Sequence, residues 1–289
     1  MPPITAPRPP QRPRGLRPPR PPAPPRPPRL PRMRLAPIRD GASVELDTAR
    51  SRSGFALPPF VRWDRFMADF RWPQGQHVNV VGPTGSGKTV LNRHLLRRRD
   101  YVVVLGVKQR DPELYGPFQA EGYHLVRKFD PEPPADAERW RVLFVPQTDK
   151  YGTEARQEKS KAFRQAIHDV MRAGDWCLYG DDILYLSDQL GLKPDLEELW
   201  ILSRSEGISV VASSQEPVNI PVMAYSAATH LFLFKNPDLY RAKRMAELTG
   251  VNREVAQETI MRLPDHEFLY INKSTTEMLR SRVIVARGG

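Results

Sequence analysis

The stretch Gly82-Pro83-Thr84-Gly85-Ser86-Gly87-Lys88-Thr89 decides the fold, because it matches the phosphate-binding loop pattern G-x-x-x-x-G-K-[ST]. The apolar run 78–81 precedes it and predicts a buried strand, and residues 89–98 follow with the apolar spacing of a helix. Glycines between a strand and a helix let backbone N–H groups and the helix N-terminus point at one ligand. The stretch therefore predicts a site for the phosphates of a nucleotide.

The loop residues differ in the chemistry that they offer. We expect the Lys88 ammonium to reach the β- and γ-phosphates and the Thr89 hydroxyl to bind Mg²⁺. The remaining contacts to the nucleotide are expected from Gly82, Pro83, Thr84, Gly85, Ser86, Gly87 and Val90. The alternative is a glycine-rich turn that carries Lys-Thr by chance.

Length and composition limit the class of protein. The chain has 289 residues, of which 40% are hydrophobic, so it can bury a sizeable core. Its single cysteine, Cys177, excludes an intrachain disulfide framework and a cysteine metal cluster. No apolar run reaches the ~18 residues of a membrane span, and prolines and arginines interrupt the N-terminus where a secretory signal would be apolar. We expect a soluble, cytoplasmic protein with no membrane insertion.

The net charge of +11 comes mostly from one end of the chain. Residues 1–34 hold nine arginines and no acid, whereas the rest holds 35 basic and 33 acidic residues. Residues 1–37 also contain 16 of the 31 prolines, which predicts a disordered Pro/Arg-rich tail, followed by a connector over 38–58 and one folded domain over 59–289. A basic tail suggests an anionic partner, nucleic acid most often, although a solubilising arm is equally consistent.

Apolar runs alternate with helical patterns along the folded domain. Strands are expected at 101–107, 141–145, 176–180, 208–213, 229–234 and 267–271, with a short one at 43–46 in the connector. Helices are expected at 60–70, 159–173, 195–206, 238–248 and 252–262. The first of these carries an aromatic face that we expect to pack on the core, although one of its aromatics could instead stack on adenine. Such alternation predicts an α/β fold with a mostly parallel sheet covered on both faces.

Two strands end in polar residues that suit nucleotide chemistry. Asp181 and Asp182 follow the strand 176–180, and we expect Asp181 to hold Mg²⁺ and Asp182 to orient or deprotonate a water. Gln215 follows the strand 208–213 and is placed to sense a γ-phosphate. The alternative for the two acids is a solvated turn at a strand end.

These features together resemble the FtsK–HerA superfamily of P-loop ATPases, ring-forming motors that pump DNA. The resemblance rests on the phosphate loop, on the strand ending at Asp181-Asp182, on Ser203-Arg-Ser-Glu-Gly-Ile208 and on Ala212-Ser-Ser-Gln215-Glu-Pro217. It covers roughly residues 60–289 and implies a P-loop NTPase of the RecA-like, additional-strand type, with a central sheet flanked by helices. Two residues depart from the family pattern. Asp182 occupies the position where the family usually has Glu, and Glu216 occupies a position where it often has Arg.

The resemblance also implies how such a protein works. It implies ATP and Mg²⁺ as cofactors, double-stranded DNA as the partner in packaging or transfer of phage or plasmid type, and a homo-oligomeric ring, a hexamer in the usual case. Arg204 matches the family arginine that acts on a neighbour's nucleotide, and Lys150, Arg156 and Lys159 are candidates for DNA contact. Two alternatives stay open, namely an ATP-driven assembly or export factor that acts on protein and docks a protein partner, and a slow ATP-dependent switch.

Overall fold

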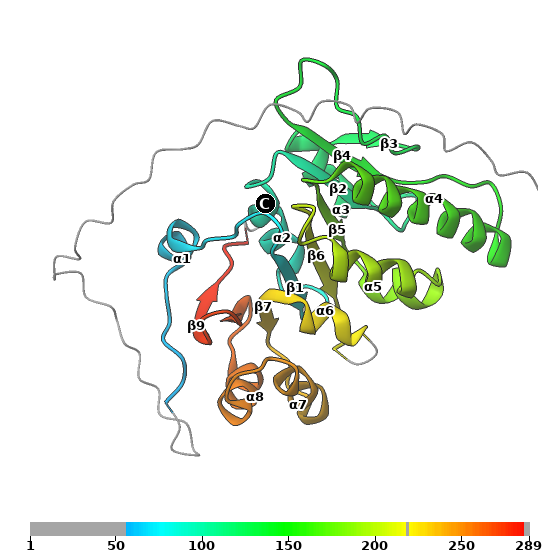
Figure 1. The fold of residues 1–289 in the computed structure, drawn as a ribbon. Coiled ribbons are helices and arrows are strands. Elements are labelled where there is room, and N and C mark those ends of the chain that lie inside the picture. The colour runs from blue at the N-terminus through cyan, green and yellow to red at the C-terminus, as the bar shows by residue number, and fades with distance from the viewer. Residues whose placement is uncertain (1–55, 218–219, 286–289) are drawn as a thin grey trace, which may run out of the picture. The chain divides into compact units, whose positions relative to one another are not determined.

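The computed structural model describes residues 56–217 and 220–285, so the tail and the strand expected at 43–46 lie outside the described residues (Figure 1). Its centre is a nine-stranded sheet in the order β3-β4-β2-β5-β6-β1-β7-β8-β9. The strands are β1 (His77–Val81), β2 (Tyr101–Leu105), β3 (His124–Val126), β4 (Trp140–Phe144), β5 (Cys177–Gly180), β6 (Ser209–Ser214), β7 (Ala228–Phe234), β8 (Glu267–Asn272) and β9 (Glu277–Arg282).

Helices connect these strands and cover the sheet. They are α1 (Trp63–Asp69), α2 (Lys88–Leu96), α3 (Pro112–Ala120), α4 (Gly152–Ala173), the π-helical turn η1 (Tyr185–Gln189), α5 (Lys193–Leu202), α6 (Val222–Ser226), α7 (Leu239–Glu247) and α8 (Arg253–Arg262). No helix in the described ranges is long and apolar enough to cross a membrane.

The strand order confirms the predicted type of fold. All neighbouring strand pairs from β3 to β7 in the sheet order are parallel, and the pairs β7–β8 and β8–β9 are antiparallel. β6 lies between β1 and β5, which is the additional-strand arrangement. Because these strands are parallel, their carboxyl ends meet at one edge of the sheet. We call this the carboxyl edge; it holds the residues that follow β1, β5 and β6.

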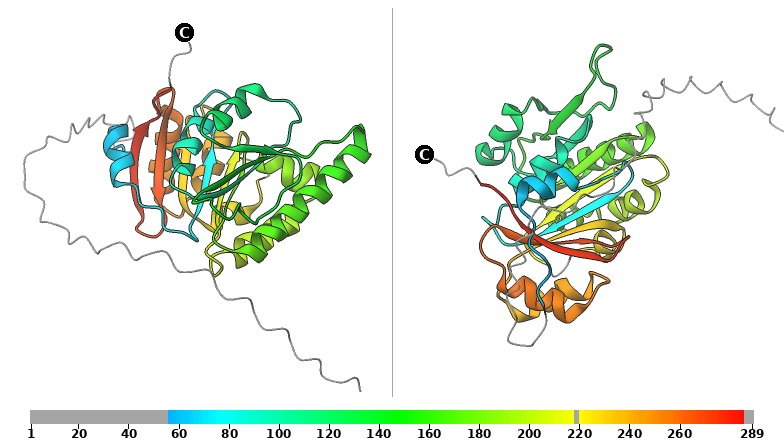
Figure 2. Two further views of the ribbon diagram at one scale, coloured as in Figure 1. Left: turned by 90° about the horizontal axis from the view of Figure 1, so that it is seen from above. Right: turned by 90° about the vertical axis from the view of Figure 1, so that its left-hand side faces the viewer.

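The two faces of the sheet bury separate apolar cores. One core packs α1, α2 and α3 against side chains such as Val80 and Tyr179, and the other packs α4, α5, η1, α6, α7 and α8 against side chains such as Val81 and Leu178 (Figure 2). Successive residues of a buried parallel strand point to opposite faces, so a run of apolar residues serves both cores.

Helix α1 packs on the sheet as expected from its aromatic face. Phe66 and Phe70 are buried, and their ring centroids lie 5.2 Å and 5.7 Å from that of Tyr270 on β8. Trp63, at the start of the helix, stays partly exposed. Just before α1 the chain closes the outer side of β9, because Val61 N donates to Arg280 O at 2.8 Å and Arg280 N donates to Pro59 O at 2.7 Å.

Several elements differ from the sequence-based expectation. α3, β3, η1, α6 and β9 were not predicted. α3 contains Pro112, Gly116 and Pro117, which disguise its helical pattern, although Asp111 accepts a hydrogen bond from Leu114 N at 3.0 Å and caps it. α4 begins at Gly152, seven residues before the predicted start at 159. The sequence did not reveal its first turns, because they are mostly exposed and lack the apolar stripe of an amphipathic helix.

The first residue of β1 is a buried histidine that fixes the amino ends of two strands. His77 is 3% exposed, its Nδ1 accepts a hydrogen bond from Val210 N at 3.1 Å, and its Nε2 lies 3.3 Å from Ser203 Oγ. Burial, together with the positive charge of Arg204, lowers the pKa of His77 to about 4. The folded protein therefore holds this imidazole neutral.

This histidine predicts a pH dependence of stability. Since the pKa is lowered on folding, its contribution is complete above about pH 6.5 and is lost as the pH falls toward 4. At pH 5 the loss relative to pH 7 should be about 2 kcal/mol of unfolding free energy from this group. Urea denaturation of the wild type and of His77→Gln, whose amide oxygen can accept the same bond, should show a smaller pH effect in the variant. An equal pH effect in both proteins would contradict the assignment.

Candidate nucleotide-binding site

The predicted phosphate loop leaves the carboxyl end of β1 and enters α2. Gly85 and Gly87 have φ angles of +76° and +104°, a region that favours glycine, and Gly87 is the N-cap residue of α2. At Gly82 a Cβ atom would lie 2.5 Å from Phe234 Cβ, so only glycine fits beside β7. The loop thus has the close-packed backbone and the helix start that bind phosphates.

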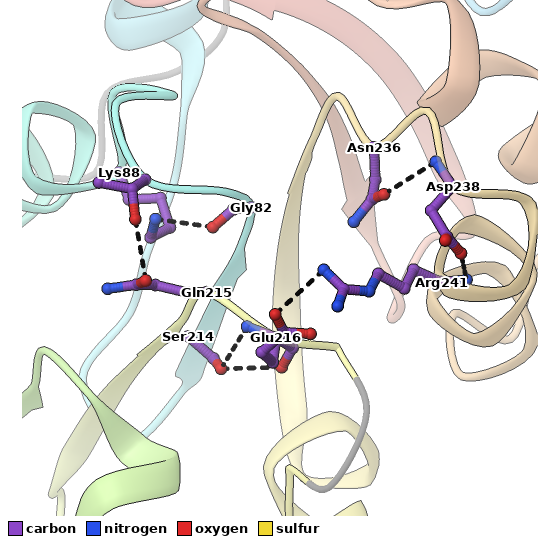
Figure 3. A network of polar contacts seen from close by, with 9 residues as sticks. Gly82, Lys88, Ser214, Gln215, Glu216, Asn236, Asp238 and Arg241 are labelled. Atoms are coloured by element: carbon purple, nitrogen blue, oxygen red, sulfur yellow. Dashed lines mark hydrogen bonds and ion pairs between the residues drawn. The ribbon is translucent and has the colours of Figure 1, made fainter.

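Lys88 is buried at the centre of this loop. Its Nζ donates a hydrogen bond to Gly82 O at 2.7 Å (Figure 3) and another to Pro83 O at 2.8 Å. Burial lowers the pKa of Lys88 to about 8, and the charges of Asp181 and Asp182 oppose that shift. The side chain is therefore mainly a cation at neutral pH, and the two acids lie close enough to stabilise it.

Asp181 follows β5 and is held by a chain of hydrogen bonds from α2. Tyr179 Oη donates to Asp181 Oδ1, and Asn92 Nδ2 donates to Tyr179 Oη at 3.1 Å. Burial raises the pKa of the Asp181 carboxyl, while the Tyr179 hydrogen bond and the Lys88 charge lower it. Sequence reasoning missed Asn92 and Tyr179; the available signals were a polar residue in the apolar stripe of α2 and a tyrosine two residues before the acid.

Asp182 follows Asp181, and its carboxylate accepts a hydrogen bond from the backbone of the next turn. Its Oδ1 accepts a hydrogen bond from Tyr185 N at 3.1 Å, and its backbone oxygen accepts one from Leu186 N at 3.2 Å. The carboxylate therefore caps the helical turn that leads into η1, as an N-cap residue does. A carboxylate used as a cap has one oxygen left for other chemistry.

Gln215 follows β6 and reaches the phosphate loop. Its Oε1 accepts a hydrogen bond from Thr84 Oγ1 at 2.8 Å, as Figure 3 shows. The next residue, Glu216, pairs with Arg241 of α7 at 3.0 Å, and its backbone N donates to Ser214 Oγ at 3.2 Å. The acid that departs from the family pattern thus has a cationic partner within the chain.

The turn before β8 also contacts the loop. His266 has a φ of +64° and places its Nδ1 3.3 Å from Ser86 O, where the ring can donate a hydrogen bond. This contact spans 180 residues of sequence. No local pattern around His266 predicts it.

The remaining candidates lie away from the loop. Arg204 is exposed in the turn between α5 and β6, at the opposite edge of the sheet from the phosphate loop. Lys150 pairs with Glu158 at 2.8 Å, and Lys159 Nζ donates to Val107 O at 3.2 Å. Arg156 lines two neighbouring grooves of about 550 Å³ and 560 Å³ at the start of α4.

The described residues contain no group of three or more His, Cys, Asp and Glu side chains that could hold a metal ion alone. Mg²⁺ does not need such a group, because it keeps several waters and binds through one or two protein ligands plus substrate phosphates. Thr89 at the start of α2 and Asp181 at the end of β5 fit that chemistry. The donor set is therefore compatible with Mg²⁺ bound together with a nucleotide.

The hydrogen bond from Tyr179 to Asp181 can be tested directly. Tyr179→Phe removes the donor that orients Asp181 and should weaken binding of Mg²⁺ together with ATP by roughly ten- to a hundredfold, the range for partners of metal ligands. Tyr123→Phe is the matched control, because Tyr123 Oη is buried without a hydrogen-bond partner among the described residues. Calorimetric titration of ATP with and without Mg²⁺ checks this; equal losses in both variants would contradict it.

No protein-family model and no curated protein sequence matches the chain. Solved structures do match it. The genome packaging NTPase B204 from Sulfolobus turreted icosahedral virus 2, in complex with AMPPCP, is 16% identical, with a TM-score of 0.53 over 73% of this chain and 100% of that chain. The DNA-packaging ATPase B204 from Sulfolobus Turreted Icosahedral Virus is 18% identical, with a TM-score of 0.52 over 74% and 100%.

A third similar structure comes from a different source. VirB4 of Thermoanaerobacter pseudethanolicus is 10% identical, with a TM-score of 0.53 over 73% of this chain and 90% of that chain. At such identities the likeness shows the fold. The chain therefore shares the α/β fold of these NTPases, and this is the fold that the sequence predicted.

Proposed function

We propose that the chain is a Mg²⁺-dependent ATPase that translocates double-stranded DNA as a ring of identical subunits, with six subunits as the expected number. The observation that carries the proposal is the convergence of Lys88, Asp181 and Gln215 at the carboxyl edge, from three neighbouring strands. The fold that the chain shares with B204, a genome packaging NTPase, supports DNA as the substrate.

The proposed roles follow from the chemistry of phosphoryl transfer. The loop from Gly82 to Val90 binds the phosphates, and Lys88 neutralises charge on the β- and γ-phosphates. Thr89 and Asp181 would hold Mg²⁺, which would supply positive charge beside the reacting phosphates. Asp182 orients the attacking water, and Gln215, already bonded to Thr84, senses the γ-phosphate.

Arg204 is proposed to complete the site of a neighbouring subunit. Hydrolysis needs positive charge on the transferring group, and an arginine supplied from another subunit can provide it. Arg204 lies at the opposite edge of the sheet from its own loop, so it cannot reach that loop in the same chain. A head-to-tail ring brings two different surfaces of neighbouring subunits together. The proposal requires the amino ends of the strands of one subunit, where Arg204 lies, to face the carboxyl edge of the next.

DNA contact is proposed for basic residues outside the nucleotide site. Arg156 is the strongest candidate, because it lines both grooves at the start of α4, whereas Lys150 is engaged with Glu158. The basic tail adds nine arginines for the phosphate backbone.

One observation favours a second candidate function, the slow ATP-dependent switch. Asp182 caps the turn before η1, and an aspartate reaches less far than the glutamate usual at this position. A protein that binds ATP tightly but orients water poorly would hydrolyse it slowly.

DNA-stimulated hydrolysis separates these functions. The ATPase rate of the wild type should rise at least severalfold when duplex DNA is added at low salt, and Lys88→Ala should abolish hydrolysis with and without DNA. A slow rate that DNA leaves unchanged would favour the switch, and stimulation only by a protein partner would favour an assembly or export factor. Hydrolysis by Lys88→Ala would overturn the site itself.

Mixing two inactive variants tests the action of Arg204 on a neighbour. Arg204→Ala and Lys88→Ala should each be inactive, and a 1:1 mixture should recover up to roughly a quarter of wild-type activity. Recovery arises because some interfaces combine the intact Lys88 of one variant with the intact Arg204 of the other. Arg204→Lys mixed with Lys88→Ala serves as the control for charge without the planar guanidinium. No recovery in any mixture would contradict action between subunits.

A further inference from the structure

The order of the strands fixes the direction in which a bound nucleotide extends. Asp181 and Gln215 follow β5 and β6, which lie on one side of β1. The end of the triphosphate that reacts must face these two residues. The nucleoside end therefore points to the other side of β1, toward β7, β8 and β9.

On that side the loop is lined by the residue before β8, His266, and the residue after β9, Val283. His266 Nδ1 lies 3.3 Å from Ser86 O, and Val283 Cβ lies 3.7 Å from the position that a Cβ of Gly87 would take. Val283 N donates to His266 O at 3.0 Å, so these two residues form one wall. Ile284 follows directly and is 66% exposed, so its side chain is accessible to a ligand.

A groove of about 300 Å³ begins at this point, lined by Phe60, Arg62, Trp63, Asp64, Arg282 and Ile284. Trp63 packs edge-on against His94 of α2 at 5.1 Å, so the groove runs beside the helix that starts at the phosphate loop. Its size lies at the lower end of the ~300–1,000 Å³ range of small-molecule sites. Trp63 and Ile284 offer apolar surface, and the Arg62–Asp64 pair, at 3.3 Å, offers polar groups at the rim.

We propose that this groove binds the nucleobase of the nucleotide, with the base stacked on Trp63 and covered by Ile284. The proposal rests on the function proposed above for the phosphate loop. A flat aromatic base suits a partly exposed indole and an exposed aliphatic side chain, because both surfaces leave water on binding. The groove lies on the side to which the strand order directs the nucleoside, and the wall formed by His266 and Val283 connects it to the loop.

The test compares ATP with inorganic tripolyphosphate, which has the phosphates but no base. Calorimetric titration of the full chain with Mg²⁺ present should show ATP binding at least about tenfold more tightly than tripolyphosphate. Trp63→Ala should lose most of this preference, on the order of tenfold, while its affinity for tripolyphosphate stays unchanged. Trp63→Phe should retain the preference, because a phenyl ring still stacks.

Trp63→Ala also removes packing contacts of α1, so a second variant that leaves α1 intact is needed. Ile284→Ser alters an exposed residue and should weaken ATP severalfold without affecting tripolyphosphate. Leu125→Ser is the matched control, because Leu125 is 47% exposed on β3, at the far edge of the sheet, and should change neither affinity.

Each outcome decides between the two proposals. Equal binding of ATP and tripolyphosphate by the wild type would overturn the base site and leave the phosphate site standing. An unchanged preference for ATP in both Trp63→Ala and Ile284→Ser would place the base elsewhere. Failure of the wild type to bind either ligand would overturn the proposed function together with the groove.

Discussion

The buried ammonium of Lys88 is the constraint on which the rest of the structure depends. A cation removed from water is costly unless hydrogen bonds and opposite charges surround it. Two loop carbonyls supply the hydrogen bonds, and Asp181 and Asp182 supply the charge, although they come from a strand almost 100 residues later. The parallel sheet meets this need, because it brings the carboxyl ends of strands that are distant in sequence to one edge. The parallel arrangement therefore serves the site as well as the core.

Much of this arrangement could be predicted from the sequence. Fully apolar strands such as Val102–Leu105 and glycines at fixed spacing are local signals, and they identified the fold and the positions of Lys88, Asp181 and Gln215. Elements whose patterns are broken by proline or dominated by charge, such as α3 and β9, were missed. The contacts of Asn92, Tyr179 and His266 were also missed, because they join residues that are distant in the chain and depend on the sheet order.

The structure supplies a cationic partner for Glu216, a residue that departs from the family pattern. The sequence alone shows only that an acid stands where the family often has a base. In the structure Arg241 of α7 pairs with it, and Asp238 caps the same helix by accepting a hydrogen bond from Arg241 N at 2.8 Å (Figure 3). A half-exposed pair of this kind adds only ~0–1 kcal/mol to stability. Its effect is geometric, because it fixes the segment that follows Gln215 against α7.

The segment before α1 covers part of one edge of the sheet. By bonding to Arg280 on both its N–H and its carbonyl, the 59–61 segment uses hydrogen-bonding groups on the open side of β9. At the opposite end of the sheet β3 is only three residues long. Neither margin invites a neighbouring chain to add its own strand, which is how exposed sheet edges become sites of aggregation. A neighbouring copy would therefore have to pack on helices and loops, and it could separate again without breaking a shared sheet.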